Sequence, residues 1–103
     1  MKYVLHPGAE DDLREAAEFY REHAGSLLWQ SFLAEFGISA DTLLEHPMLG
    51  APWKRGSRRL LLASFPYSLI YAIAEDEIGV VAVAHQSRRP GYWRGRKWSV
   101  RAV

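Results

Sequence analysis

The spacing of apolar residues changes near the middle of the chain and divides it into a helical half and a strand half. Pro7 suits the first turn of a helix, and Gly25 suits the position just past its end. Between them the apolar residues recur with the i, i+3, i+4, i+7 spacing of one helix face: Leu13, Ala16, Ala17 and Tyr20. This pattern predicts a first helix within residues 6–25, and its acidic residues are expected to form the solvent-exposed face.

A second apolar stripe follows after only a few residues. Ser26 can cap this second helix, and Pro47 stops it. The stripe consists of Trp29, Phe32, Leu33, Phe36, Ala40, Leu43 and Leu44. Because the connection between the two helices is so short, we expect an antiparallel helix hairpin.

The second half of the chain has the composition of β-strands. Residues 58–65, 67–74 and 78–85 are three apolar runs separated by short turn signals. Their tight connections predict an antiparallel meander, and residues 2–5 form a plausible strand ahead of the helices. We therefore predict an α+β fold with the hairpin packed on a small, mostly antiparallel sheet, followed by a short C-terminal helix or tail.

The length and composition narrow the classes of protein to consider. A chain of 103 residues predicts one domain, residues 1–103. It has no cysteine, which excludes disulfides and thiolate metal sites. No apolar stretch approaches the roughly 20 residues that span a bilayer, so we expect a cytoplasmic protein with no membrane partner.

The net charge of +1 conceals a strong asymmetry between the two halves. Residues 1–51 contain three cations and nine anions, a balance of −6, whereas residues 52–103 contain ten cations and three anions, a balance of +7. Such a dipole can direct one face of the protein toward a polyanion. The alternative is a solvated acidic hairpin beside a basic sheet edge, and charge alone leaves both interpretations open.

The first candidate site lies just past the last apolar run. His85 has the side chain best suited to acid–base chemistry near neutral pH, and Arg88 and Arg89 could neutralise a phosphate. A histidine at the end of a strand that only hydrogen-bonds the backbone is the competing interpretation.

Two further basic segments are candidates for binding a target. Residues 53–59 contain Lys54, Arg55, Arg58 and Arg59, which suits a phosphate backbone or a merely solvated loop. In the tail, Tyr92, Trp93 and Arg94 could stack on unpaired bases, although internal packing or a protein partner is favoured for such residues.

Other chemistry has little support in the sequence. The four histidines have neither H-x-x-x-H spacing nor nearby cysteines, so no metal site is predicted. No phosphate loop or dinucleotide fingerprint is present, and we expect no cofactor.

These features together resemble the RelE/ParE superfamily of bacterial toxins. The resemblance rests on the strand and acidic helix hairpin, on "FPYSLIYAI" (65–73) and on "VAVAHQSRRPGYW" (81–93), and it covers residues 2–97. It implies the toxin of a type II toxin–antitoxin pair. The implied partner is a cognate antitoxin whose acidic or amphipathic C-terminal segment covers the active face, and the hydrophobic helix faces leave a homodimer open.

RelE-like members of this superfamily cleave mRNA on the ribosome without a metal. The resemblance implies a role for each matching position. Arg59 would take the place of one strand lysine, and Arg88 or Arg89 would be the arginine that stabilises the transition state. Tyr92 would be the aromatic residue, and His85 is a further candidate. Two positions depart from that pattern, because Leu61 and Ser68 stand where cations are expected.

ParE-like members share the fold, lack that full set of cations and are known for poisoning DNA gyrase. The departures at two positions favour this branch, in which the basic and aromatic residues 81–98 would be a docking surface. A ribosome-dependent endoribonuclease and a non-toxic module that binds nucleic acid or protein remain the alternatives.

Overall fold

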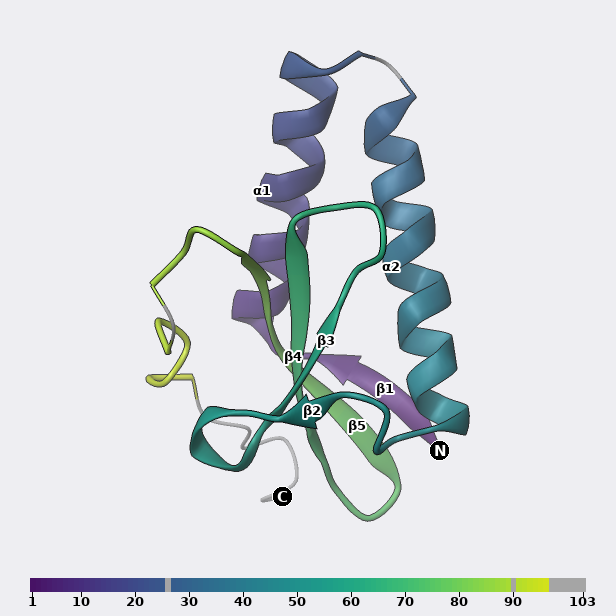
Figure 1. The fold of residues 1–103 in the computed structure, drawn as a ribbon, viewed down its shortest axis with the longest axis vertical. Helices are drawn as coiled ribbons and strands as arrows, with labels where there is room; N and C mark the ends of the chain where they lie inside the picture. Colours follow the sequence, from purple (N-terminus) through teal and green to yellow (C-terminus); the bar gives the residue numbers. More distant parts are fainter. Residues whose placement is uncertain (26, 90, 97–103) are drawn as a thin grey trace.

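A computed structural model describes residues 1–25, 27–89 and 91–96 of the chain. Two helices and five strands follow one another in an α+β arrangement (Figure 1), which confirms the predicted fold class. The elements are β1 (Lys2–Leu5), α1 (Pro7–His23), α2 (Leu28–Glu45), β2 (Ala51–Pro52), β3 (Arg58–Leu61), β4 (Tyr67–Ile73) and β5 (Glu77–His85). The predicted cap at Ser26 lies outside the described residues.

The five strands form one sheet in the order β1-β5-β4-β3-β2. Strands β3, β4 and β5 form the antiparallel meander that the short turns predicted. Strand β2 also pairs antiparallel, with β3, and β1 runs parallel to β5 with Leu5 beside Val80. Strand β2 was not predicted, because its two residues lie in a segment rich in Pro and Gly. Pro52 has no N–H to donate, so this pairing is possible only at the edge of the sheet.

The helix hairpin packs on one face of the sheet and forms the main core. Phe32 and Leu43 of α2 are fully buried there with Leu69 and Tyr71 of β4. Aromatic rings join the hairpin to the loop before β4, since Phe32 lies 5.3 Å from Phe65 between ring centroids. The apolar stripes of the two predicted helices therefore face the sheet.

A second, smaller core covers the opposite face of the sheet, which we call the far face. Side chains alternate along β4, so Ile70 points away from the helices while its neighbours point toward them. Ile70 packs there with Ala82, Ala84 and Trp93, and Trp93 is only 4% exposed. A bulge helps to build this face, because Ile70 pairs with Ala82 and Tyr71 with Val80, which leaves Val81 as an extra residue in β5.

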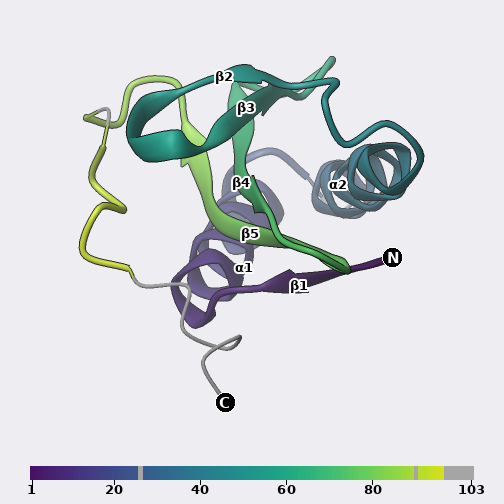
Figure 2. The ribbon, with the colours of Figure 1, turned by 90° about the horizontal axis from the view of Figure 1, so that it is seen from below.

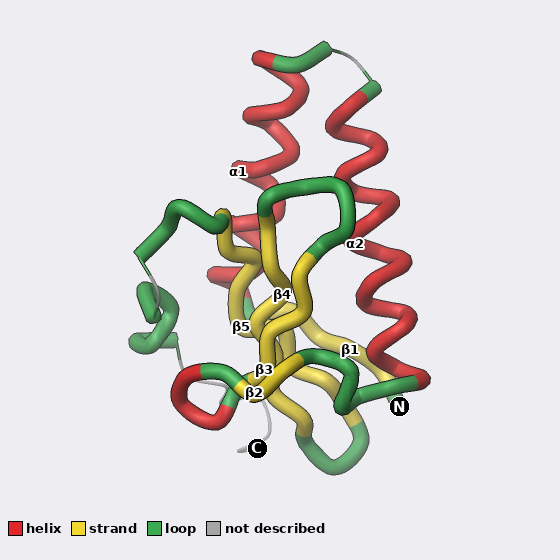
Figure 3. Tube along the Cα trace, viewed as in Figure 1, coloured by secondary structure: helices red, strands yellow, loops and turns green. Residues whose placement is uncertain are grey.

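The loop between β2 and β3 and the segment after β5 lie on the same side of the β4–β5 pair, away from α2 (Figures 1 and 2). The first of these loops contains a short 3₁₀ turn at Lys54–Gly56, drawn in red in Figure 3. The segment from Gly91 to Arg96 consists of turns, and Lys97–Val103 lie outside the described residues. Among the described helices, none combines the length and apolarity that crossing a bilayer requires.

A buried tyrosine fastens the loop after α2 to the sheet. The Tyr71 hydroxyl donates to the carbonyl of Pro47 at 2.7 Å and accepts from the amide of Gly50 at 2.9 Å. The contact requires glycine at position 50, because a Cβ there would lie 2.7 Å from the Tyr71 hydroxyl oxygen. This loop leads directly into β2 and the basic loop that follows.

We expect Tyr71→Phe to lower the free energy of unfolding by about 1–3 kcal/mol, because it leaves the buried Gly50 N–H without an acceptor. Urea denaturation followed by circular dichroism measures the change. Tyr20→Phe is the matched control, since the Tyr20 hydroxyl bonds to no described residue; equal losses in the two variants would show that the two hydrogen bonds stabilise nothing.

Candidate functional site

The far face carries two hollows, one on each side of the buried Trp93. The first is lined by Arg59, Arg88 and Arg89 together with Trp53 and Trp93. The second is lined by Arg55, Arg94 and Arg96, again beside Trp93. Five of these residues make no ion pair with any described carboxylate, and we call them the arginine face: Arg55, Arg59, Arg88, Arg89 and Arg94.

The register of the strands decides which residues of β3 reach the far face. Arg59 pairs with Ile70, so its side chain shares the face of Ile70. The neighbouring Arg58 points to the helix side, where its guanidinium donates to the carbonyl of Gly50. Arg58 was predicted to contact the target together with Arg59, but alternation along the strand separates the two side chains.

Two arginines that line the first hollow each lie over an aromatic ring. The guanidinium carbon of Arg59 lies 3.8 Å from the ring centroid of Trp53, and that of Arg88 lies 3.8 Å from the ring centroid of Tyr92. Lys54 lies farther out over Trp53, at 5.4 Å. Stacking fixes the orientation of a guanidinium and leaves its edge free to donate hydrogen bonds.

The loop that carries Arg55 has a strained backbone. Arg55 has φ 61° and ψ 37°, a left-handed conformation that is uncommon for any residue except glycine. Two bonds close the loop around it: the Trp53 amide donates to the Ser57 carbonyl at 2.8 Å, and the Ser57 hydroxyl donates to the Lys54 carbonyl at 2.6 Å. The loop thereby places Arg55 beside the second hollow.

A buried carboxylate on α1 holds the segment that carries Trp93. Asp12 is 6% exposed and accepts from the Tyr92 hydroxyl at 2.9 Å and from the Arg96 guanidinium at 2.8 and 3.2 Å. We call these three residues the Asp12 clasp. The expectation that all acidic residues of this helix form its solvent-exposed face is wrong for Asp12. This residue lies three positions after Ala9 and four before Ala16, so it shares their buried side of the helix.

The Asp12 clasp also makes hydrogen bonds that a neighbouring strand would otherwise make to the edge of β5. Strand β1 ends at Leu5, and past that point the edge of β5 is bonded by side chains. Asp12 accepts from the Val83 amide at 3.1 Å, and Arg96 donates to the Val81 carbonyl at 3.0 Å. Gly8 leaves the space for Arg96, because a Cβ at Gly8 would lie 2.4 Å from Nε of that side chain. Neither Asp12 nor Arg96 was predicted as a site residue.

Burial and the neighbouring carboxylate both raise the pKa of Tyr92. Its hydroxyl therefore remains protonated at neutral pH and continues to donate to Asp12. A hydrogen bond to the same carboxylate raises the pKa of Arg96, so its guanidinium stays charged. Tyr92 lies on the helix side of the segment, whereas its neighbour Trp93 lies on the far face.

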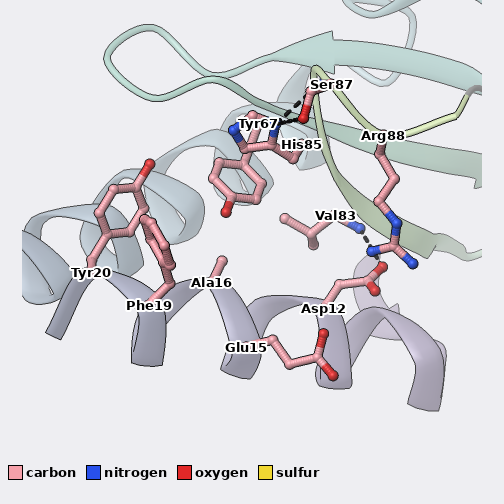
Figure 4. Close-up of a pocket in the computed structure, with 10 residues that line it drawn as sticks. All are labelled: Asp12, Glu15, Ala16, Phe19, Tyr20, Tyr67, Val83, His85, Ser87 and Arg88. Carbon is pink, nitrogen blue, oxygen red and sulfur yellow. Dashed lines mark hydrogen bonds between the residues drawn. The ribbon is translucent and has the colours of Figure 1, made fainter. Parts of the chain in front are cut away.

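His85 ends β5 beside a third hollow, between α1 and the strand edge (Figure 4). Its ring meets Tyr67 edge-on with centroids 5.0 Å apart. Nδ1 accepts from the Ser87 amide at 3.0 Å and lies 2.8 Å from the Ser87 hydroxyl. These bonds shape the turn that leads to Arg88.

The structure brings together Arg59, Arg88, Arg89 and Trp93 of the predicted site residues, with Arg55 and Arg94 on the other side of Trp93. It places Arg58 on the opposite face and engages Tyr92 in the clasp. Lys54 lies at the outer rim, over Trp53, and His85 also borders the first hollow.

The fold itself is that of a known toxin–antitoxin component. A solved chain described as "Chromosomal ParDE TA system from P. aeruginosa" superposes with a TM-score of 0.74 at 19% sequence identity, covering 82% of this chain and 95% of that chain. This likeness defines the fold class: a helix hairpin on one face of a small sheet.

Sequence comparison gives the family. A family model described as "ParE toxin of type II toxin-antitoxin system, parDE" matches residues 3–90. "Toxin ParE2" of Mycobacterium tuberculosis is 27% identical over 86 residues, covering 84% of this chain and 82% of that protein. "Putative toxin Y4kP" of Sinorhizobium fredii is 41% identical over 56 residues, 52% of this chain and 58% of that protein. The chain belongs to the ParE toxin family of type II toxin–antitoxin systems.

We expect Asp12→Asn to release the segment that carries Trp93, because the amide cannot accept from all the donors that Asp12 satisfies. Breaking a buried ion pair costs about 3–5 kcal/mol, and a loss of even 1.4 kcal/mol raises the open population tenfold. Trypsin should then cleave after Arg94 at least about tenfold faster, as measured by mass spectrometry under native conditions.

Asp11→Asn is the matched control, since Asp11 is exposed and bonds only Arg14 on its own helix. Arg96→Gln tests the same clasp from its other side if Asp12→Asn folds poorly. A cleavage rate after Arg94 equal to that of the wild type in both Asp12→Asn and Arg96→Gln would contradict the role of the clasp.

Proposed function

We propose that this toxin inhibits DNA gyrase by binding it through the arginine face, without catalysing a reaction of its own. Membership in the ParE family supports a toxin, and the resemblance of its sequence to gyrase-directed members supports this target. The observation that carries the proposal is the engagement of Tyr92, because the aromatic residue on which a ribonuclease of this superfamily would depend donates a hydrogen bond to Asp12.

The surroundings of the first hollow support binding rather than phosphate cleavage. Leu61 and Ser68, which replace the cations expected in a ribonuclease, both line this hollow. An oxyanion-stabilising donor is worth about 3 kcal/mol in a transition state, so two missing cations would cost several kcal/mol. Binding has no such requirement, since a docking surface needs complementary charge and shape only.

A cognate antitoxin is the partner that we propose for neutralisation. An acidic segment would cover the arginine face by charge attraction alone, and its apolar contacts would lie elsewhere on the toxin. A groove between α1 and α2 offers apolar contacts for an amphipathic helix through Leu13, Ala17, Trp29 and Leu33. A second copy of this chain is the competing occupant of that groove.

We expect the purified toxin to inhibit supercoiling by gyrase and to leave cleaved DNA complexes. Arg88→Gln and Arg89→Gln should each raise the half-inhibitory concentration about tenfold, because a lost charge-assisted hydrogen bond costs about 1.5–3 kcal/mol. The gel-based supercoiling assay measures both effects, and the purified product of an adjacent antitoxin reading frame should abolish them.

His85→Gln separates binding from ribosome-dependent cleavage, because it removes the acid–base group and keeps a side chain of similar reach. Because a glutamine Oε1 can still accept from the Ser87 amide, inhibition of gyrase should be weakened less than by Arg88→Gln. Cleavage of mRNA on ribosomes by the wild type and its loss in His85→Gln, with gyrase unaffected, would replace the proposed function by that of an endoribonuclease.

A further inference from the structure

The charges of the described residues are divided between two sides of the molecule. The two hollows of the far face are lined by six arginines and by no aspartate or glutamate among the described residues. The hollows on the helix side are mixed: three arginines line them, and so do six carboxylates, namely Asp12, Glu15, Glu10, Glu18, Asp41 and Glu45. A polyanion is therefore attracted more strongly to the two hollows of the far face than to the helix side.

The donors of the first hollow are held in place but have no acceptor. Trp53 Nε1 and Arg59 Nε are both buried without a hydrogen-bond partner among the described residues. A buried N–H that lacks an acceptor costs about 1–3 kcal/mol. Because the ring of Trp53 already orients Arg59, a ligand whose oxygens reach the outer guanidinium nitrogens of Arg59 gains hydrogen bonds at a low entropic cost.

The shape of the far face distinguishes between possible polyanions. An acidic peptide that binds tightly needs an apolar anchor buried between its charges. Trp93, the aromatic ring between the two hollows, is 4% exposed and already packed on Ala82 and Ala84, so it offers no such anchor. Its burial also prevents stacking on unpaired bases. A chain of phosphates needs neither contact, because guanidinium groups line both hollows that border Trp93.

We propose that the arginine face binds the phosphate backbone of duplex DNA directly and without sequence preference. Two guanidinium-lined hollows on either side of Trp93 take phosphates of one strand, and Arg55, Arg59, Arg88, Arg89 and Arg94 supply the charge. This inference rests on the proposed function in one respect only: DNA is chosen as the polyanion because it is the substrate that gyrase holds. Contact with that DNA would strengthen the toxin's hold on the enzyme–DNA complex.

The salt dependence of DNA binding measures how many phosphates the protein neutralises. Each neutralised phosphate contributes about 0.9 to the slope of log K against log salt for duplex DNA. Five contacts predict a slope of about −4.5, and affinity should fall by a factor of the order of 10²–10³ between 50 and 200 mM KCl. Fluorescence anisotropy with a labelled 20-base-pair duplex measures the slope without gyrase.

Arg89→Gln and Arg94→Gln remove one cation from each hollow, and both side chains are exposed, so the fold should be unaffected. Each variant should reduce the slope by about 0.9 and the double variant by about 1.8. Arg21→Gln, the same change on α1, is the matched control and should retain the wild-type slope.

Three results would overturn the inference: a wild-type slope in the double variant, tighter binding of the corresponding RNA duplex, or tighter binding of a polyglutamate peptide than of DNA at 150 mM KCl. The inference and the proposed function fail separately. Gyrase inhibited by a toxin that does not bind DNA would leave the proposed function intact, whereas DNA binding without effect on gyrase would remove that function and leave the inference.

Discussion

The far face of this toxin depends on one buried carboxylate on the other side of the sheet. Asp12 accepts from Tyr92, from Arg96 and from the backbone of β5, and these bonds fix the segment that places Trp93. Trp93 in turn divides the two hollows of the arginine face. Arg88 is tied to the same clasp, since its guanidinium lies on the ring of Tyr92. The arrangement of the arginine face is therefore set by contacts on the opposite side of the sheet.

The sequence predicted the two helices because each has one regular apolar face, and it predicted the three long strands because each is a run of apolar residues between turn signals. It could not predict β2, whose two residues carry no periodic signal, or the bulge at Val81, which depends on the pairing of two strands. The parallel pairing of β1 with β5 is likewise a long-range contact. These features follow from tertiary packing, which local patterns do not record.

The candidate site was only partly predictable for the same reason. Arg59, Arg88, Arg89 and Trp93 meet because β3, β4 and the segment after β5 converge on one face. The period of two along a strand already separates Arg58 from Arg59, and this signal was present in the sequence. Asp12 carried a signal too, since it lies within the apolar stripe of its helix; its partner Arg96 lies 84 positions away and left none.

The charge asymmetry of the sequence becomes two opposed surfaces in the fold, an acidic helix side and a basic far face. The comparisons give the family, and the clasp links that family's fold to the arrangement of this particular docking surface. The half-inhibitory concentration of Asp12→Asn, Arg96→Gln and their double variant in the supercoiling assay tests this link most directly. Each single variant should weaken inhibition about tenfold, and the double variant should be no weaker than either, because all three break one clasp. Full inhibition by the double variant, in a folded protein, would show that the clasp does not hold the surface that we propose acts on gyrase.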